Sequence, residues 1–266
     1  MTVLVISAVI GVFVGVLSGM LGIGGGMAMI PIFRLGYGMQ AIQATATSLF
    51  AIVPTSAAGL VTHIRNKTCY PRLGVAAGIG GALTSVAGVH LANMSPSWLV
   101  MLAAAMVIGY SAFTMFRKAM AVPKRASAPD GKATDADADE TPLTRRKLLI
   151  GAVIGLVAGV ASGYVGVGGG FIMIPMFISL LGTSMKKASG TSLIAICILA
   201  IPGVVSQLML GNVMVAAGAA MAAGAIPGAI LGANLTKRIP ERQLRFVFAI
   251  LLVFAAIMLV VNEFPA

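Results

Sequence analysis

Two stretches of this sequence decide the fold, and they are copies of one another: Ser18-Gly-Met-Leu-Gly-Ile-Gly-Gly-Gly-Met-Ala-Met-Ile-Pro-Ile-Phe33 and Ser162-Gly-Tyr-Val-Gly-Val-Gly-Gly-Gly-Phe-Ile-Met-Ile-Pro-Met-Phe177. The offset is 162 − 18 = 144 positions. Without a gap it also aligns Ala44-x-x-Thr-Ser48 with Ala188-x-x-Thr-Ser192. About thirty identities over residues 11–118, with prolines and glycine triplets in register, indicate an internal duplication.

The composition is that of a membrane protein. Of the 266 residues, 59% are hydrophobic and 9% are charged, whereas a water-soluble domain carries roughly 25% charged residues. Several apolar runs reach the ~18 to 20 residues that cross a bilayer core. These features exclude soluble enzymes, secreted disulfide scaffolds and disordered tails. The N-terminus lacks the basic region and cleavage site of a signal peptide, so we expect it to remain as the first membrane segment.

Each copy is expected to contain four apolar segments. Their bounds are 2–35, 41–62, 73–92 and 98–116 in the first copy, and 148–182, 188–210, 213–235 and 243–261 in the second. The residues between the copies are rich in charge and have no apolar period, which is typical of a solvated segment. We therefore predict a membrane repeat over residues 1–117, a disordered cytoplasmic linker over 118–147 and a second membrane repeat over 148–266.

The 18 basic residues indicate that the repeats are inverted. They end apolar segments rather than form a stripe on a helix, which fits lipid headgroups as neighbours and argues against a nucleic-acid partner. If all eight segments cross once, the repeats are parallel and the basic residues divide 11 to 7 between the two sides. If the first segment of each repeat enters and leaves on one side, the division is 17 to 1. Positive charge gathers on the cytoplasmic side, so the inverted arrangement is favoured.

Glycine clusters give a mechanical reason for such a return. Segments 2–35 and 148–182 are too long for one span and too short for two, and glycines interrupt them at 22–26 and 166–170. Three consecutive glycines break a helix, and irregular backbone within a bilayer is tolerated only where it lines a protein cavity. The sequence therefore predicts an all-α polytopic membrane protein with two inverted repeats. Each repeat is a re-entrant broken-helix hairpin followed by three transmembrane helices.

The two glycine turns are the candidate substrate site. A glycine-rich turn that leads into a helix presents unpaired N–H groups and the positive end of the helix dipole, and both favour an anion. The segment after each hairpin adds neutral hydroxyl donors. The candidate substrate-binding residues are Gly24, Gly25, Gly26, Thr47 and Ser48, and their repeat partners Gly168, Gly169, Gly170, Thr191 and Ser192.

The alternative for these residues is that they only let helices pack closely, as small-xxx-small patterns do. We expect that role for three glycine stripes, which are Gly11, Gly15 and Gly19; Gly155, Gly159 and Gly163; and Gly224, Gly228 and Gly232. Packing needs only one glycine per turn of helix. For the triplets Gly24–Gly26 and Gly168–Gly170 the binding-site interpretation is therefore favoured.

The predicted spanning segments contain no carboxylate, because all seven acidic residues lie in the linker, in a basic loop (Glu241) or at the C-terminus (Glu263). Cation transporters and proton pumps usually place Asp or Glu at the midplane, so we expect an anionic or neutral substrate. His63, whose repeat partner is Gln207, is the candidate for a proton relay, with a hydrogen-bonded structural role as the alternative. No metal-ligand spacing and no dinucleotide-binding context is present, so we expect neither a metal nor a cofactor.

The paired Ser-Gly-x-x-Gly-x-Gly-Gly-Gly motifs at 18–26 and 162–170, each followed by Pro31 or Pro175 and then by Ala-x-x-Thr-Ser, resemble the TauE/SafE family of sulfite and organosulfonate exporters. The family is also called the four-toluene sulfonate uptake permease family. The resemblance covers the whole chain outside the linker. It implies a membrane transporter for sulfite, sulfoacetate, thiosulfate or a similar anion, in agreement with the donor-rich turns and the missing carboxylates.

We therefore predict a multi-pass protein of the inner cell membrane that acts as a secondary transporter, an exporter of a small sulfur-containing oxyanion such as sulfite or an organosulfonate. Alternating access would arise as one repeat rocks against the other around the site. The alternative is a passive anion channel that uses the same donors. An intramembrane serine protease is a third reading, but no serine has the Gly-x-Ser-x-Gly context and positioned base that it needs, so we predict no enzyme.

Overall fold

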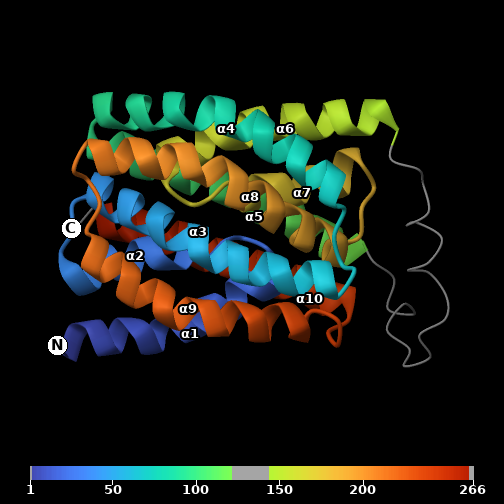
Figure 1. Ribbon diagram of the computed structural model, residues 1–266, viewed down its shortest axis with the longest axis horizontal. Coiled ribbons are helices and arrows are strands. Elements are labelled where there is room, and N and C mark those ends of the chain that lie inside the picture. Colours follow the sequence, from blue (N-terminus) through green and yellow to red (C-terminus); the bar gives the residue numbers. More distant parts are fainter. Residues whose placement is uncertain (1, 122–143, 264–266) are drawn as a thin grey trace.

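The described part of the chain is entirely helical. The computed structural model describes residues 2–121 and 144–263, and over these ranges it contains helices and no strand. The predicted linker falls mostly on residues 122–143, outside the described residues. The helices are α1 Thr2–Leu21, α2 Gly26–Tyr37, α3 Ala41–Arg65, α4 Pro71–Met94, α5 Ser97–Ala121, α6 Arg145–Val165, α7 Gly170–Leu180, α8 Met185–Met209, α9 Val215–Leu235 and α10 Glu241–Glu263 (Figure 1).

The first apolar segment of each repeat is two helices rather than one. The break lies at the glycine clusters, where α1 ends at Leu21 and α2 begins at Gly26. Gly24 and Gly25 have φ angles of 80° and 87°, and Gly168 and Gly169 have φ angles of 87° and 74°. Residues with a side chain rarely adopt this left-handed backbone. The glycines therefore permit a tight change of direction that other residues would resist.

The helices of one repeat pack against helices of the other. Helix α1 lies along α9, and α6 lies along α4. The glycine stripes are the reason, because a Cβ atom placed at Gly15 would lie 2.2 Å from the carbonyl oxygen of Ala225, and one at Gly159 would lie 2.2 Å from that of Gly81. Such distances admit no side chain. The packing role predicted for the three stripes is confirmed, and the two repeats interlock through backbone contact.

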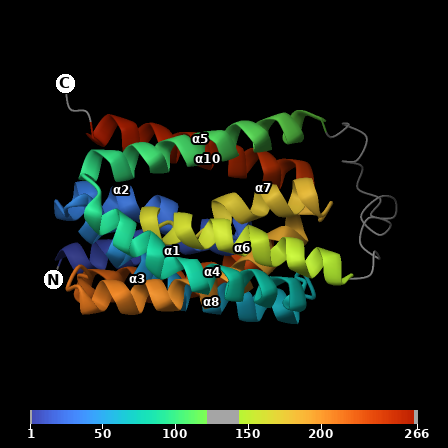
Figure 2. The same ribbon diagram turned by 90° about the horizontal axis from the view of Figure 1, so that it is seen from above.

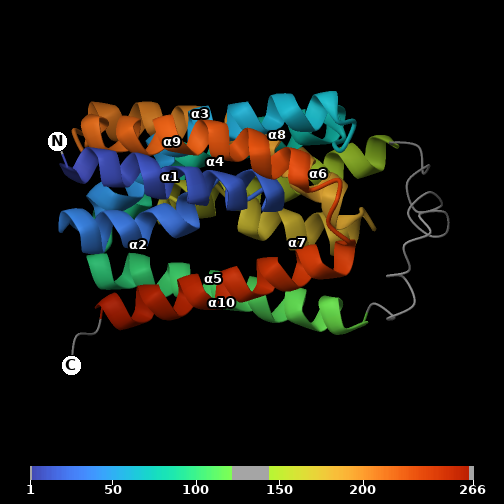
Figure 3. The same cartoon turned by 90° about the horizontal axis from the view of Figure 1, so that it is seen from below.

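The helices form a body and an outer layer. Figures 2 and 3 show α5 and α10 side by side in a layer apart from α1, α3, α4, α6, α8 and α9. The short helices α2 and α7 lie between the two groups, with α2 at one end of the molecule and α7 at the other (Figure 3). This arrangement places the starts of α2 and α7 at the centre of the protein.

Among the residues that the structure describes, six helices are long and apolar enough to cross a membrane: α3, α4, α6, α8, α9 and the stretch Ser97–Arg117 of α5. Large apolar side chains such as Phe13, Leu83 and Phe113 point outward, as lipid-facing residues do. Helix α1 begins and α10 ends at one end of the molecule, whereas α5 ends and α6 begins at the opposite end (Figures 1 and 3). The chain is thus a multi-pass membrane protein.

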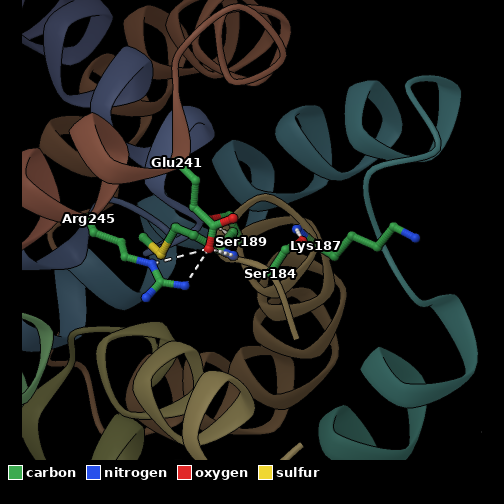
Figure 4. A network of polar contacts seen from close by, with 6 residues as sticks. Ser184, Lys187, Ser189, Glu241 and Arg245 are labelled. Carbon is green, nitrogen blue, oxygen red and sulfur yellow. Dashed lines mark hydrogen bonds and ion pairs between the residues drawn. The ribbon is translucent and has the colours of Figure 1, made fainter. Parts of the chain in front are cut away.

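The start of α8 is tied to α10 by a polar network (Figure 4). The backbone amide of Met185 donates to the Glu241 carboxylate over 3.0 Å, and the Arg245 guanidinium pairs with the same carboxylate oxygen. Ser184 adds a cap, because its hydroxyl accepts from the Lys187 amide at 3.4 Å. A carboxylate at a helix N-terminus also stabilises the helix dipole. The network therefore links the outer layer to the body at the end of the molecule where α5 ends.

Candidate functional site

The two glycine turns meet at the centre of the protein. A Cβ atom placed at Gly26 would lie 2.9 Å from the Val167 Cα, and one at Gly170 would lie 2.6 Å from the Gly22 carbonyl oxygen. The start of α2 therefore contacts the second turn, and the start of α7 contacts the first. Residues 22–27 and 166–171 are all buried. The structure thus brings together all six candidate glycines, which come from segments 144 positions apart.

Each turn holds a run of buried amides without acceptors. In the first turn, Gly22 donates to the Ser18 carbonyl at 2.8 Å, and Ala28 and Met29 both donate to the Gly25 carbonyl at 3.1 Å. The hydrogen bonds of the described residues include none donated by the amides of residues 23–27, or by those of the matching residues 167–171. A buried amide without a partner is destabilising, and at a helix N-terminus the missing partner is commonly a ligand.

The candidate serines hold the turns in place. The Ser48 hydroxyl on α3 lies 2.7 Å from the Gly166 carbonyl oxygen, and the Ser192 hydroxyl on α8 lies 2.7 Å from the Gly22 carbonyl oxygen. Each hydroxyl also lies close to a carbonyl of its own helix, at 2.9 Å from Thr45 and 2.8 Å from Ser189. The hydroxyl of each serine thus donates its hydrogen bond to backbone carbonyl oxygens. They lie at the site and fix the turn of the opposite repeat.

The candidate threonines face other parts of the molecule. Thr47 accepts a hydrogen bond from the Met214 amide at 3.0 Å, and Thr191 accepts one from the Tyr70 amide at 2.9 Å. Met214 and Tyr70 immediately precede α9 and α4. A helix turns about 100° per residue, so Thr47 points away from the face that Ser48 turns toward Gly166. The threonines anchor the first turns of α9 and α4, and the structure does not bring them to the glycine turns.

Two isoleucines, Ile52 and Ile196, fill the space beside the turns. They are repeat partners, each lies one turn of helix beyond a candidate serine, and both are 0% exposed. A Cβ atom at Gly24 would lie 3.0 Å from Ile52 and 3.2 Å from Ile196, and one at Gly168 would lie 3.2 Å and 3.5 Å from the same two side chains. The space between α3, α8 and the turns is therefore apolar and closed in this conformation.

Two buried hydroxyls at the turns escaped the sequence analysis. Ser18 and Ser162 lie in the last turns of α1 and α6 and are 1% and 0% exposed. Neither hydroxyl has a hydrogen-bond partner. The signal was present in the sequence, because both serines open the repeated motif. The sequence-based prediction covered only the hydroxyls of the segment that follows each hairpin.

The histidine lies at the edge of the site and has partners on both ring nitrogens. His63 Nε2 lies 2.9 Å from the Gly19 carbonyl oxygen, which can only accept, so Nε2 carries a proton. Nδ1 lies 2.7 Å from the Thr68 hydroxyl. In the second repeat, Gln207 and Asn212 occupy the equivalent positions and share a hydrogen bond of 2.8 Å. In the second repeat, the contact equivalent to that between His63 and Thr68 is therefore made by Gln207, whose side chain cannot titrate.

Within the described residues, no group of three or more His, Cys, Asp or Glu side chains is placed to hold a metal ion. The basic residues of the described ranges lie at or near the helix ends. The donors at the turns are therefore neutral amides and hydroxyls. Such a donor set suits an anion, which accepts hydrogen bonds through several oxygens.

A multi-pass helical bundle with two broken helices that meet at its centre, and with unpaired donors at the break, has the architecture of a membrane transporter. A comparison with protein families identifies the family of transporters to which the chain belongs. The model of the family described as "Sulfite exporter TauE/SafE" matches residues 7–259, so the chain belongs to this family.

Curated relatives are named as transporters. The chain is 27% identical to the probable membrane transporter protein YunE of Bacillus subtilis, over 96% of this chain and 97% of the relative. It is 25% identical to the probable membrane transporter protein YdhB of the same organism, over 87% and 89%. It is 24% identical to a probable membrane transporter protein of Methanocaldococcus jannaschii, over 92% and 90%. No solved structure matches the chain. These findings support a membrane transporter.

Proposed function

We propose that this protein is a secondary transporter of the inner cell membrane that exports a small sulfur-containing oxyanion, such as sulfite or an organosulfonate. Two runs of buried backbone amides, at residues 23–27 and 167–171, carry the proposal. No amide in either run donates a hydrogen bond to another described residue. Two helix N-termini add their positive dipole ends. The family name supports the sulfur oxyanion as the class of substrate.

The proposed binding residues are the glycines of the two turns, with Ser48 and Ser192 as the residues that hold the turns. Their hydroxyls fix the Gly166 and Gly22 carbonyls at 2.7 Å, so the amides keep their positions when no ligand is bound. Fixed donors stabilise an anion without a cost of reorganisation. In this proposal Thr47 and Thr191 act indirectly, by fixing the starts of α9 and α4.

The proposed topology has inverted repeats with re-entrant hairpins, α1–α2 and α6–α7. It is supported by the opposite directions of the two repeats and by the central starts of α2 and α7 (Figure 3). The charges agree with this topology. Basic residues lie in or beside the α3–α4, α7–α8 and α9–α10 connections, at the end of the molecule where α5 ends, and Arg34 on α2 is the exception. By the positive-inside rule, the end where α5 ends is cytoplasmic.

The proposed transport mechanism is alternating access. Because the repeats interlock through glycine contacts, we place the movement between the body and the α5–α10 layer rather than between whole repeats. The layer contacts the short helices α2 and α7 and also the body helices α1, α3, α6 and α8. Ile52 and Ile196 close the space beside the turns in this conformation. A closed centre favours a transporter over the alternative, a passive anion channel with a continuous pore.

The test is a flux screen in proteoliposomes with sulfite, sulfate, thiosulfate, sulfoacetate and taurine. We expect uptake of at least one sulfur oxyanion that saturates with concentration and is accelerated by the same anion on the other side. Flux that rises linearly with concentration and shows no exchange would establish the channel instead. If none of the five compounds moves in protein that is shown to be folded, the proposed function is wrong.

A further inference from the structure

Ser18 and Ser162 differ from the other buried hydroxyls of the helices. Most buried serines here donate to a backbone carbonyl three or four residues earlier, as Ser56, Ser85 and Ser189 do at 3.0, 3.3 and 2.9 Å. The same bond is open to any helical serine. Ser18 and Ser162 do not make it, and their oxygens have no other partner. Two equivalent positions in a duplicated chain thus share an unusual and unfavourable state.

Both serines belong to the amide runs. The Gly22 amide donates to the Ser18 carbonyl and the Gly166 amide to the Ser162 carbonyl, both at 2.8 Å, so each serine lies one helical turn before its glycine turn. A Cβ atom at Gly25 would lie 3.4 Å from the Ser18 Cβ, in ordinary contact. The Ser18 side chain therefore faces Gly25, in the middle of the first run of unpaired amides. Ser162 is the repeat partner of Ser18 in the last turn of α6, where its hydroxyl is likewise buried and has no partner.

We propose that the hydroxyls of Ser18 and Ser162 are substrate-binding donors that complete the two amide runs around an oxyanion. This inference rests on the proposed function and deepens it. A hydroxyl that already donates to its own helix has no hydrogen left for a ligand, whereas these two do. Together with the amides they form a neutral donor set, which suits the three oxygens of a sulfite or sulfonate group.

The proposal separates two effects of removing the hydroxyls. Without an anion, Ser18→Ala and Ser162→Ala remove a buried group that lacks a partner, so thermal stability should stay the same or rise. With an anion, each change removes a hydrogen bond to a charged group. The double variant should therefore bind sulfite at least about 10-fold more weakly. Ser85→Ala is the matched control, because Ser85 is buried, is already bonded to its own helix, and has Ala229 as its repeat partner.

The experiment is a titration of sulfite and of methanesulfonate into purified, dialysed protein in detergent, with thermal unfolding measured in parallel. Weaker binding by the double variant, with unchanged binding by Ser85→Ala, is the expected result. If the parent binds and the double variant binds equally well, the serine assignment is wrong and the proposed function stands. If the double variant unfolds without an anion, the hydroxyls are structural and the assignment is again wrong. If the parent binds neither anion, both the proposed site and the serine assignment fall.

Discussion

At the scale of single residues, neighbouring hydroxyls of one motif have different roles. Thr47 and Ser48 are adjacent in Ala-x-x-Thr-Ser, yet Ser48 contacts the opposite glycine turn and Thr47 holds the Met214 amide before α9. Thr191 and Ser192 repeat this division. The sequence showed that hydroxyls follow each hairpin. It did not show which side of the helix meets the turn, because that depends on how α3 and α8 are rotated in the packed bundle.

The threonines provide the first prediction. Thr47→Val and Thr191→Val keep the shape but remove the acceptor of a backbone amide, so each should lower the free energy of unfolding by about 1 kcal/mol. Sulfite affinity should change little, because the threonines do not lie at the turns. Thr114→Val, which removes only a bond within α5, is the control. Thermal unfolding and titration calorimetry measure the two effects. If sulfite affinity falls by about 5-fold or more while stability is unchanged, the threonines bind the substrate directly and this prediction is wrong.

His63 provides the second prediction. Since Gln207 makes the equivalent contact in the second repeat, His63→Gln should keep the bond to the Thr68 hydroxyl or the Gly19 carbonyl and preserve folding. If the imidazole is structural, sulfite flux and its dependence on pH should match those of the parent. Flux in proteoliposomes between pH 5.5 and 8 measures this, with Gln207→His as the matched control. Loss of flux driven by a pH gradient in His63→Gln, with flux down a sulfite gradient retained, would establish the proton relay.

At the scale of elements, the sequence predicts the helices well and their contacts poorly. The eight predicted segments correspond to the ten helices of the described residues, because the glycine clusters split the first segment of each repeat where expected. Segment 98–116 continues as a helix to Ala121. The sequence could not show that α1 packs on α9 and α6 on α4, because a glycine stripe marks a contact surface without naming its partner. Ser18 and Ser162 open the repeated motif, but the sequence does not show that their hydroxyls lack a partner, because that depends on where their neighbours lie.

The two glycine turns give a prediction about sulfite binding. Gly25→Val and Gly169→Val should abolish sulfite binding, because a β-branched residue resists φ angles of 87° and 74° and its side chain meets Val14, Met29 and Ala158. Gly36→Val is the control, since nothing lies within 4 Å of its Cβ position. Size-exclusion chromatography and thermal unfolding identify folded variants. If the valine variants do not fold, Gly25→Ala and Gly169→Ala are tested instead. Normal sulfite binding by a folded variant would exclude the glycine turns as the binding site.

At the scale of the whole molecule, the proposed inverted topology predicts which positions face the cytoplasm. In a background without Cys69 and Cys197, single cysteines at Lys186 and Asp130 should both be shielded from an impermeant thiol reagent outside intact cells, whereas one at Ser95 should react. Lys186 is a suitable reporter, whereas its neighbour Met185 is 0% exposed and would not react on either side. Permeabilised cells, in which all three should react, are the control. Labelling at Lys186 but not at Asp130 in intact cells would support parallel repeats instead.

The interlocked packing gives a prediction about assembly. Because α1 and α6 each lie against a helix of the other repeat, neither half of the chain has its own complete core. Residues 1–129 or 130–266 expressed alone should therefore aggregate or be degraded.

The same halves expressed together should associate, copurify and transport sulfite like the intact chain, since contacts between the described helices of the two repeats join them. Copurification on a tag placed on one half, followed by flux measurement, tests this. The matched control is the coexpressed pair with Gly15→Leu, whose side chain would meet the Ala225 carbonyl at a distance that no atom tolerates, and which should block association. A half that folds and stays monodisperse by itself would show that the repeats are independent bodies, and it would restore rocking of one repeat against the other as the transport movement.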